Sequence, residues 1–341
     1  MNSRSSEDDF DPSSLSALRR FMLFLIGYAL LIILWGAFVR ISGSGDGCGV
    51  HWPLCEGEWI PFGAEIQTWI EYFHRAKSGL FGILIFAFWF WSFRALPKTH
   101  MARGLANMVL FFMVVEALLG AALVKFGWVD QDASSARVLM HSAHFVNTLL
   151  LLASMSLFWV ASYFKDPKWV VPTRSQANWV SVCLGLFLAL GITGSWAALS
   201  TMLFQVTSLS DGLALDLSAE SPWYVQFRFL HPLLAVILTG CLLFLIARLQ
   251  HLLPLKRAWI GKVLTLLVFI QIAFGFSTLL ALSPVWMKLV HLLLADLLWI
   301  NFMFFIGWSF TRDLVQKLDA AKQKDGARIV SRFDLTRVGN A

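Results

Sequence analysis

Long apolar stretches separated by short polar segments dominate the chain. Eight of these stretches reach about 20 residues, the length that a helix needs to cross a hydrocarbon layer of about 30 Å. We place the helices at residues 19–40, 68–93, 104–124, 138–164, 178–203, 226–248, 258–282 and 285–311. The pattern predicts an all-α integral membrane protein with eight transmembrane helices.

The composition supports this class. Hydrophobic residues make up 58% of the chain and charged residues 14%, whereas soluble proteins carry about 25% charged residues. The net charge of +6 comes from basic residues in the connections between apolar stretches. This placement is typical of membrane topology, so we expect membrane lipid, and no nucleic acid, around the protein.

The basic residues also predict the orientation. The N-terminus, the 2–3, 4–5 and 6–7 connections with their flanks, and the C-terminal tail hold 20 of the 27 Lys and Arg residues. The positive-inside rule therefore places both termini in the cytoplasm. The acidic residues Glu7, Asp8, Asp9 and Asp11 are unlike a mitochondrial transit peptide. We expect a multi-pass protein of the bacterial inner membrane.

The chain divides into two similar halves. Residues 1–18 and 312–341 are expected as cytoplasmic tails, the latter as a fraying helix, and residues 165–177 as a cytoplasmic linker. Residues 19–164 and 178–311 each form a four-helix bundle, and His144-Phe-Val-Asn-Thr-Leu resembles His291-Leu-Leu-Leu-Ala-Asp in register. The halves are therefore predicted as a pseudo-repeat.

Two of the four cysteines, Cys48 and Cys55, lie in the first outer loop. The outer compartment tolerates disulfides, so a disulfide is favoured, while a redox-active pair or a metal site with His51 are the alternatives. Cys183 and Cys241 lie inside apolar stretches and are expected to pack there.

Five histidines lie on even-numbered helices near the outer end: His74, His141, His144, His231 and His291. All except His141, which lies closer to that end, are five to seven residues in. They are either hydrogen-bonded core residues or parts of a functional site, which intramembrane ionisable groups usually mark. Imidazole ligates haem iron, and a helix bundle can clamp a flat macrocycle between facing helices. Small residues nearby, such as Gly79, Gly82, Gly191 and Gly194, suit a large guest.

The spacing pairs helix 2 with helix 4 and helix 6 with helix 8. One haem is expected between His74 and His144, and another between His231 and His291. His141 lies one turn before His144, so either could be the helix-4 ligand, and the register match favours His144.

Only the first half has a carboxylate beside its histidine. Glu71 lies three residues before His74, where it could act as a base or form a salt bridge with Arg75. The matching place in helix 6 holds Arg228, a cation suited to a haem propionate. We therefore expect chemistry in the first half and a permanent redox cofactor in the second.

Two further carboxylates lie inside apolar helices. Glu116 in helix 3 and Asp296 in helix 8 are either structural hydrogen-bond partners or parts of a proton path.

Several motifs together resemble the haem A synthase family over residues 20–311. They are Ser42-Gly-Ser-Gly-Asp-Gly-Cys48, Trp52-Pro-Leu-Cys55, Glu71-x-x-His74-Arg75, His144-Phe-Val-Asn, His231-Pro and His291-Leu-Leu-Leu-Ala-Asp. The resemblance implies oxidation of the C8 methyl of haem O to a formyl group, through two hydroxylations, giving haem A for terminal oxidases. It places the substrate between His74 and His144 with Glu71 as the catalytic carboxylate. It also implies a haem b on His231 and His291, and loop cysteines of the bacterial type.

Further partners follow from this resemblance: a haem O synthase that hands over substrate, an electron acceptor of unknown identity, and a second copy of the chain. Two other functions use the same histidines. One is a di-haem electron carrier linked to a quinol, which gives no task to Glu71 or the cysteine loop. The other is a transporter whose histidines relay protons.

Overall fold

The computed structural model describes residues 12–313 and confirms an all-α membrane protein. Within these residues, eight helices are long and apolar enough to cross a membrane. They are α1 (Pro12–Ile41), α2 (Ile66–Ala95), α3 (Met101–Lys125), α4 (Ser135–Ala161), α5 (Arg174–Leu203), α8 (Leu230–Leu249), α9 (Trp259–Leu280) and α10 (Val285–Phe310).

Several helices begin earlier than their apolar stretches, because helix caps rather than hydropathy set their first turns. Helix α5 begins at Arg174 instead of 178, where Thr173 and Gln176 form a capping box. Helix α3 begins at Met101 instead of 104, and the His100 side chain accepts a hydrogen bond from the Ala102 amide at 3.1 Å. Each extra turn contains an arginine, Arg103 or Arg174, that interrupts the apolar stretch, so apolar patterning does not reveal it.

The predicted sixth helix, 226–248, differs from the structure. A short helix α7 (Trp223–Gln226) ends before a turn, and α8 starts at Leu230. Pro232 has no N–H and suits the first turn of α8, so the helix begins beside His231 rather than several residues before it. A further helix that we did not predict, α6 (Leu209–Leu217), precedes α7.

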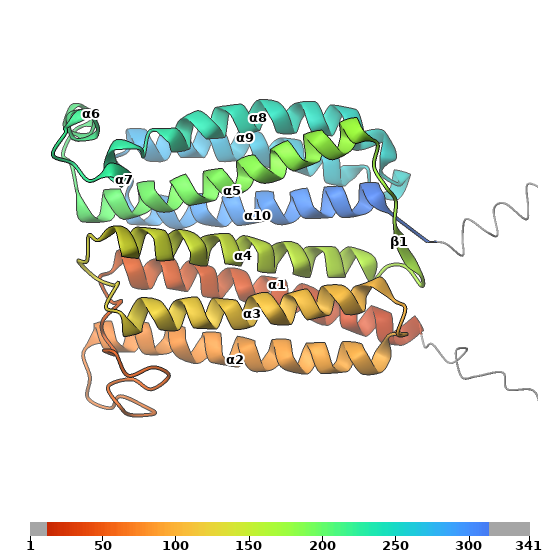
Figure 1. The fold of residues 1–341 in the computed structure, drawn as a ribbon, viewed down its shortest axis with the longest axis horizontal. Coiled ribbons are helices and arrows are strands. Elements are labelled where there is room, and N and C mark those ends of the chain that lie inside the picture. Colours follow the sequence, from red (N-terminus) through yellow and green to blue (C-terminus); the bar gives the residue numbers. More distant parts are fainter. Residues whose placement is uncertain (1–11, 314–341) are drawn as a thin grey trace, which may run out of the picture.

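The eight long helices form two groups of four (Figure 1). In the first half, α1 contacts α2 and α4, and α3 lies between α2 and α4. In the second half, α5, α8, α9 and α10 follow one another in contact. Helices α4 and α10 meet at the centre of the bundle. Of the residues in the apolar stretch of each helix, 56% are buried in α4 and 50% in α10.

The halves are joined along this seam and again at one end. The Trp299 indole donates a hydrogen bond to the Leu149 carbonyl at 2.8 Å. Strand β1 (Pro167–Trp169), in the linker, pairs antiparallel with β2 (Thr311–Asp313), which follows α10. Residues 311–313 are therefore a strand; the tail helix predicted farther along lies outside the described residues.

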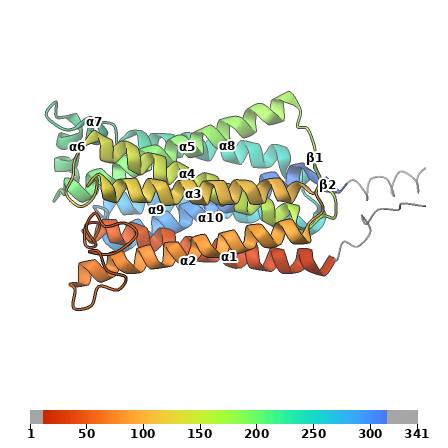
Figure 2. The ribbon, with the colours of Figure 1, turned by 60° about the horizontal axis from the view of Figure 1, so that its bottom comes forward.

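The two ends of the bundle differ. Residues 42–65 and helices α6 and α7 lie together at one end, which we call the loop end, while α1 starts and α10 finishes at the other (Figures 1 and 2). Helices α2, α4, α8 and α10 therefore all run away from the loop end. The side of the membrane that the loop end faces stays a prediction.

Candidate functional site

The first loop carries a disulfide, as the sequence predicts. Cys48 and Cys55 are bonded and buried, so their sulfurs are not free to form the alternative metal site, and the His51 side chain is exposed. No group of three or more potential ligands is found among residues 12–313. Cys183 and Cys241 pack with the apolar core, as expected.

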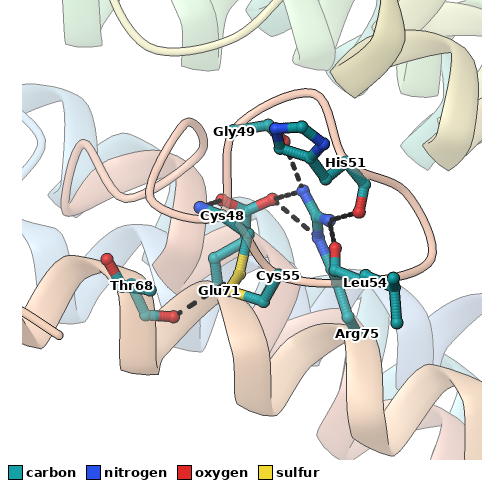
Figure 3. Close-up of a disulfide and its surroundings, with 8 residues drawn as sticks. All are labelled: Cys48, Gly49, His51, Leu54, Cys55, Thr68, Glu71 and Arg75. Carbon is teal, nitrogen blue, oxygen red and sulfur yellow. Dashed lines mark hydrogen bonds and ion pairs between the residues drawn. A yellow bond between two sulfur atoms is a disulfide. The ribbon is translucent and has the colours of Figure 1, made fainter. Parts of the chain in front are cut away.

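This loop lies directly on the first turns of α2. A Cβ at Gly47 would come within 2.7 Å of the Gln67 carbonyl group, so only glycine allows this approach. The next residue, Cys48, donates its backbone N–H to Oε2 of Glu71 at 2.8 Å (Figure 3). The disulfide loop therefore holds the Glu71 carboxylate directly.

Glu71 is 3% exposed and is bound on its other oxygen by Arg75. The Arg75 Nε and Nη2 donate to Oε1 at 2.9 and 2.5 Å. The same guanidinium donates to the carbonyls of Gly49, His51 and Leu54, so it ties the loop to α2 (Figure 3). The salt bridge considered from the sequence is confirmed. Because Oε2 accepts one bond, it keeps a second lone pair open.

Each of the four paired histidines lies against a glycine on the preceding long helix. The pairs are Gly36 with His74, Gly120 with His144, Gly194 with His231, and Gly275 with His291. A Cβ would lie 2.8 Å from the ring at Gly36, 3.0 Å at Gly194 and at Gly275, and 3.8 Å at Gly120. The missing side chains allow each imidazole to lie between two helices.

Of these glycines, the sequence analysis identified only Gly194. Gly191, also expected near the guest, faces Phe145 instead, because an added Cβ there would lie 2.8 Å from the Phe145 ring; a Cβ at Gly79 would meet nothing within 4 Å. The sequence feature that could have revealed the other three is a glycine on each odd-numbered long helix at the same depth as the histidine on the next helix.

The geometry of the second pair fits an iron between two imidazoles. The ring centres of His231 and His291 lie 6.2 Å apart. Two metal–nitrogen bonds of about 2 Å place ring centres about 6 Å apart. Nδ1 of His231 lies 3.2 Å from the Leu190 carbonyl, which leaves its Nε2 for a ligand. Nδ1 of His291 is buried without a partner among the described residues.

The first pair has a different environment. His74 and His144 lie on α2 and α4 of the same half, and Nδ1 of His74 is buried without a partner within residues 12–313. Nδ1 of His144 lies 3.7 Å from the Glu116 carboxylate, beyond hydrogen-bond distance, and is also buried without a hydrogen-bond partner among the described residues. His141 instead lies near the cations Arg40 and Arg137.

The two buried carboxylates of helices 3 and 8 have opposite environments. Glu116 accepts hydrogen bonds of 2.5 Å from both the Asn147 amide and the Thr148 hydroxyl. Asp296 is 1% exposed, and within residues 12–313 neither of its oxygens has a hydrogen-bond partner. Glu116 is thus a hydrogen-bond partner, whereas Asp296 is not one in this part of the chain.

Arg228 is engaged by helix α6. Its Nε donates to the Asp216 carboxylate at 2.5 Å, and Nη2 donates to the Gly212 carbonyl at 3.0 Å. Burial raises the pKa of the Asp216 carboxyl, and the adjacent Arg228 partly offsets this effect. Arg228 therefore fastens α6 over the start of α8.

Comparison with known proteins points to one family. The family model described as cytochrome oxidase assembly protein matches residues 19–303. A protein named Protoheme IX farnesyltransferase, from Thermus thermophilus, is 39% identical over 292 residues, covering 82% of this chain and 47% of that protein. The chain thus spans about half the length of this relative.

Proteins named Heme A synthase also match. The one from Halalkalibacterium halodurans is 26% identical over 287 residues, covering 81% of this chain and 92% of that protein. The one from an Exiguobacterium species is 34% identical over 145 residues, covering 42% and 46%.

Proposed function

The chain belongs to the cytochrome oxidase assembly protein family, and from this premise we propose that it is a haem A synthase, an oxidoreductase. Its substrate is haem O, whose C8 methyl becomes a formyl group. Two hydroxylations, each a two-electron oxidation, give a gem-diol that loses water. The observation that carries the proposal is the asymmetry of the two histidine pairs: a held carboxylate, Glu71, lies beside the first pair alone.

The substrate lies between His74 and His144. Glu71 is the catalytic carboxylate, and the open lone pair on its Oε2 receives a proton from the reacting group. Arg75 and the Cys48 N–H fix the direction of that lone pair. Such positioning matters because a base must lie within hydrogen-bond reach of the proton that it removes.

The second pair, His231 and His291, is suited to a resident haem b. That group, when bound, supplies one-electron redox chemistry. The chain's own contribution there is structural: Gly194 and Gly275 admit the rings, and the Leu190 carbonyl orients His231. Arg228 secures the cover formed by α6, and its interaction with a propionate remains a secondary proposal.

The partners follow from the same chemistry. A prenylated haem is poorly soluble in water, so transfer from a haem O synthase through membrane lipid is the expected route. The relative named Protoheme IX farnesyltransferase, twice the length of the matched region, is consistent with closely coupled steps. An electron acceptor completes the reaction, and a second copy of the chain is a further proposed partner. The proposed location is the bacterial inner membrane with both termini cytoplasmic.

The test compares Glu71→Gln with the wild type in cells that supply haem O. We expect the variant to retain bound haem, seen in its optical spectrum, and to make little or no haem A by chromatography of extracted pigment. Glu65→Gln is the matched control, because Glu65 is exposed at the start of the same helix and its side chain makes no cap hydrogen bond.

Normal haem A from Glu71→Gln would remove Glu71 from the mechanism. Bound haem without haem A from the wild type would instead favour a di-haem electron carrier. A colourless wild-type protein would favour the proton-relaying transporter.

A further inference from the structure

Seven basic side chains lie toward the loop end: Arg40, Arg75, Lys77, Lys125, Arg137, Arg228 and Lys288. Four of them either contact a partner group or are exposed to solvent. Arg75 and Arg228 each pair with a carboxylate, Lys77 Nζ lies 3.4 Å from the centre of the Trp35 ring, and Lys125 is exposed. The other three require a different explanation.

These three form what we call the cation cluster: Arg40 on α1, Arg137 on α4 and Lys288 on α10. Their helices contact one another, and the charge of Arg40 interacts with those of both other members. Arg137 is 1% exposed. Arg40 and Lys288 are half-buried, so the cluster gathers positive charge partly away from water, where charges of one sign repel more strongly than in solvent.

The Asp130 and Asp132 carboxylates partly offset the charge of Arg137, but hydrogen bonding within the described residues leaves donors of the cluster unused. Arg137 donates Nη1 to two backbone carbonyls, those of Asp130 and Asp132, and Lys288 has one long contact of 3.4 Å to the Thr201 carbonyl. Nε of Arg40 and Nε of Arg137 are buried without partners in this part of the chain.

Arg40 is the extreme member of the cluster. Its guanidinium makes no hydrogen bond or ion pair with any of residues 12–313. Its side chain is half-buried and its Nε is fully enclosed, so an anion with oxygen acceptors would pair with donors that these residues leave unused.

The position of the cluster identifies the anion. Arg40 lies one turn from Gly36, the residue against which His74 packs, and on the loop side of it. Arg137 lies two turns from His144, also on the loop side. A ligand clamped between His74 and His144 would thus meet both guanidinium groups along one edge. Haem carries its two carboxylates, the propionates, along one edge.

We propose that Arg40 and Arg137 bind the propionates of the porphyrin held between His74 and His144, and thereby set which edge of the macrocycle lies toward the loop end and Glu71. The inference rests on the proposed function. The C8 methyl, like the C5 methyl, shares its pyrrole ring with a propionate, so holding the propionates toward the loop end places these two methyls, rather than the other two, on the half of the ring nearer the loop end. Glu71 lies on that side of His74, one turn along α2.

The test measures binding rather than turnover. Detergent-solubilised full-length protein is titrated with iron protoporphyrin IX and with its dimethyl ester, in which both carboxylates are neutral. The protein has two proposed porphyrin sites. The part of the titration curve that is lost in His74→Ala is assigned to the site between His74 and His144. We expect the wild type to bind the diacid at least about tenfold more tightly than the diester, the scale of a charge-assisted hydrogen bond.

Arg40→Met should weaken diacid binding and leave diester binding unchanged, so that the preference largely disappears. Lys125→Met, which removes the same charge from an exposed position at the same end, should keep the wild-type preference. An unchanged preference in Arg40→Met, or equal affinities in the wild type, would overturn the inference.

If Arg40→Met binds neither compound, the same comparison is made with Arg40→Lys. Lysine keeps the charge but lacks the planar fork that matches a carboxylate, so the preference should narrow. An unchanged preference in that variant would likewise overturn the inference.

The two proposals fail separately. A wild type that prefers the diacid but makes no haem A would contradict the proposed function and leave propionate binding intact. Haem A formation together with equal affinities for diacid and diester would support the proposed function and contradict propionate binding by the cluster.

Discussion

The candidate site depends on residues that lack a side chain as well as on residues whose side chains can bind. Four glycines admit four imidazoles, and one guanidinium has no partner among the described residues. Both features result from close packing between helices, in which a single methyl group is felt. The residues that bind and the residues that make room are therefore equally specific.

Gly36→Ala tests the first of these glycines. The new Cβ would lie 2.8 Å from the His74 ring, so the ring must shift. Overpacking of this kind costs about 1–3 kcal/mol, which corresponds to about 5- to 150-fold weaker binding at the first site. Spectral titration measures the change.

Gly27→Ala is the matched control on the same helix, because nothing lies within 4 Å of a Cβ there. It should bind like the wild type and gain about 0.5–1 kcal/mol of stability from its higher helix propensity. Wild-type affinity in Gly36→Ala would show that the His74 ring does not depend on this contact.

At the scale of elements, the disulfide loop and α2 act as one unit. Replacing both Cys48 and Cys55 with Ser should lower the free energy of unfolding by about 2 kcal/mol. Haem A formation should fall while haem b content stays constant, because the Cys48 N–H holds Glu71, which lies in the first half. Pigment chromatography separates the two haems.

Cys241→Ala, in a helix of the other half, serves as the control for loss of a sulfur atom. Undiminished haem A from the double serine variant would mean that Arg75 positions Glu71 without the covalent closure of the loop.

The short helix α7 connects the halves at the loop end. The buried Tyr224 hydroxyl donates to the Ala133 carbonyl at 3.0 Å, so Tyr224→Phe should lower the free energy of unfolding by about 1 kcal/mol. Burial raises the pKa of Tyr224 above its usual value of about 10.

The raised pKa gives this contribution a defined pH range. A folded-state pKa above the unfolded value means that the contribution is complete below about pH 10 and is lost as pH rises through the folded-state pKa. Thermal unfolding of both proteins at neutral and strongly alkaline pH measures the difference. An equal gap at both pH values would contradict this assignment of the hydrogen bond.

Over the whole molecule, the sequence predicted the fold best where the thickness of the bilayer fixes the length of a helix. Eight spans follow from hydropathy, and the even-numbered histidines follow from depth along helices that run in one direction. The break before His231 escaped notice because Pro232 acts locally inside an apolar run. The short helix α6 has too few residues to show a period.

The site was predictable at the level of single chemical groups and not at the level of contacts. Glu71 and the Cys48–Cys55 pair stand out by type and spacing. The glycines behind the histidines, and the lack of a partner for Arg40 within residues 12–313, depend on which helices touch. No pattern within one helix carries that information.

The strand pair β1–β2 joins the linker to the end of α10, while the Ser142 and Ser195 hydroxyls, 2.9 Å apart, join α4 to α5 nearer the loop end. The two histidine pairs thus lie in halves that are fastened at two levels along the bundle. If both pairs hold haem as we propose, these fastenings oppose separation of the halves, so the rate of electron transfer between the haems would depend on driving force more than on domain motion.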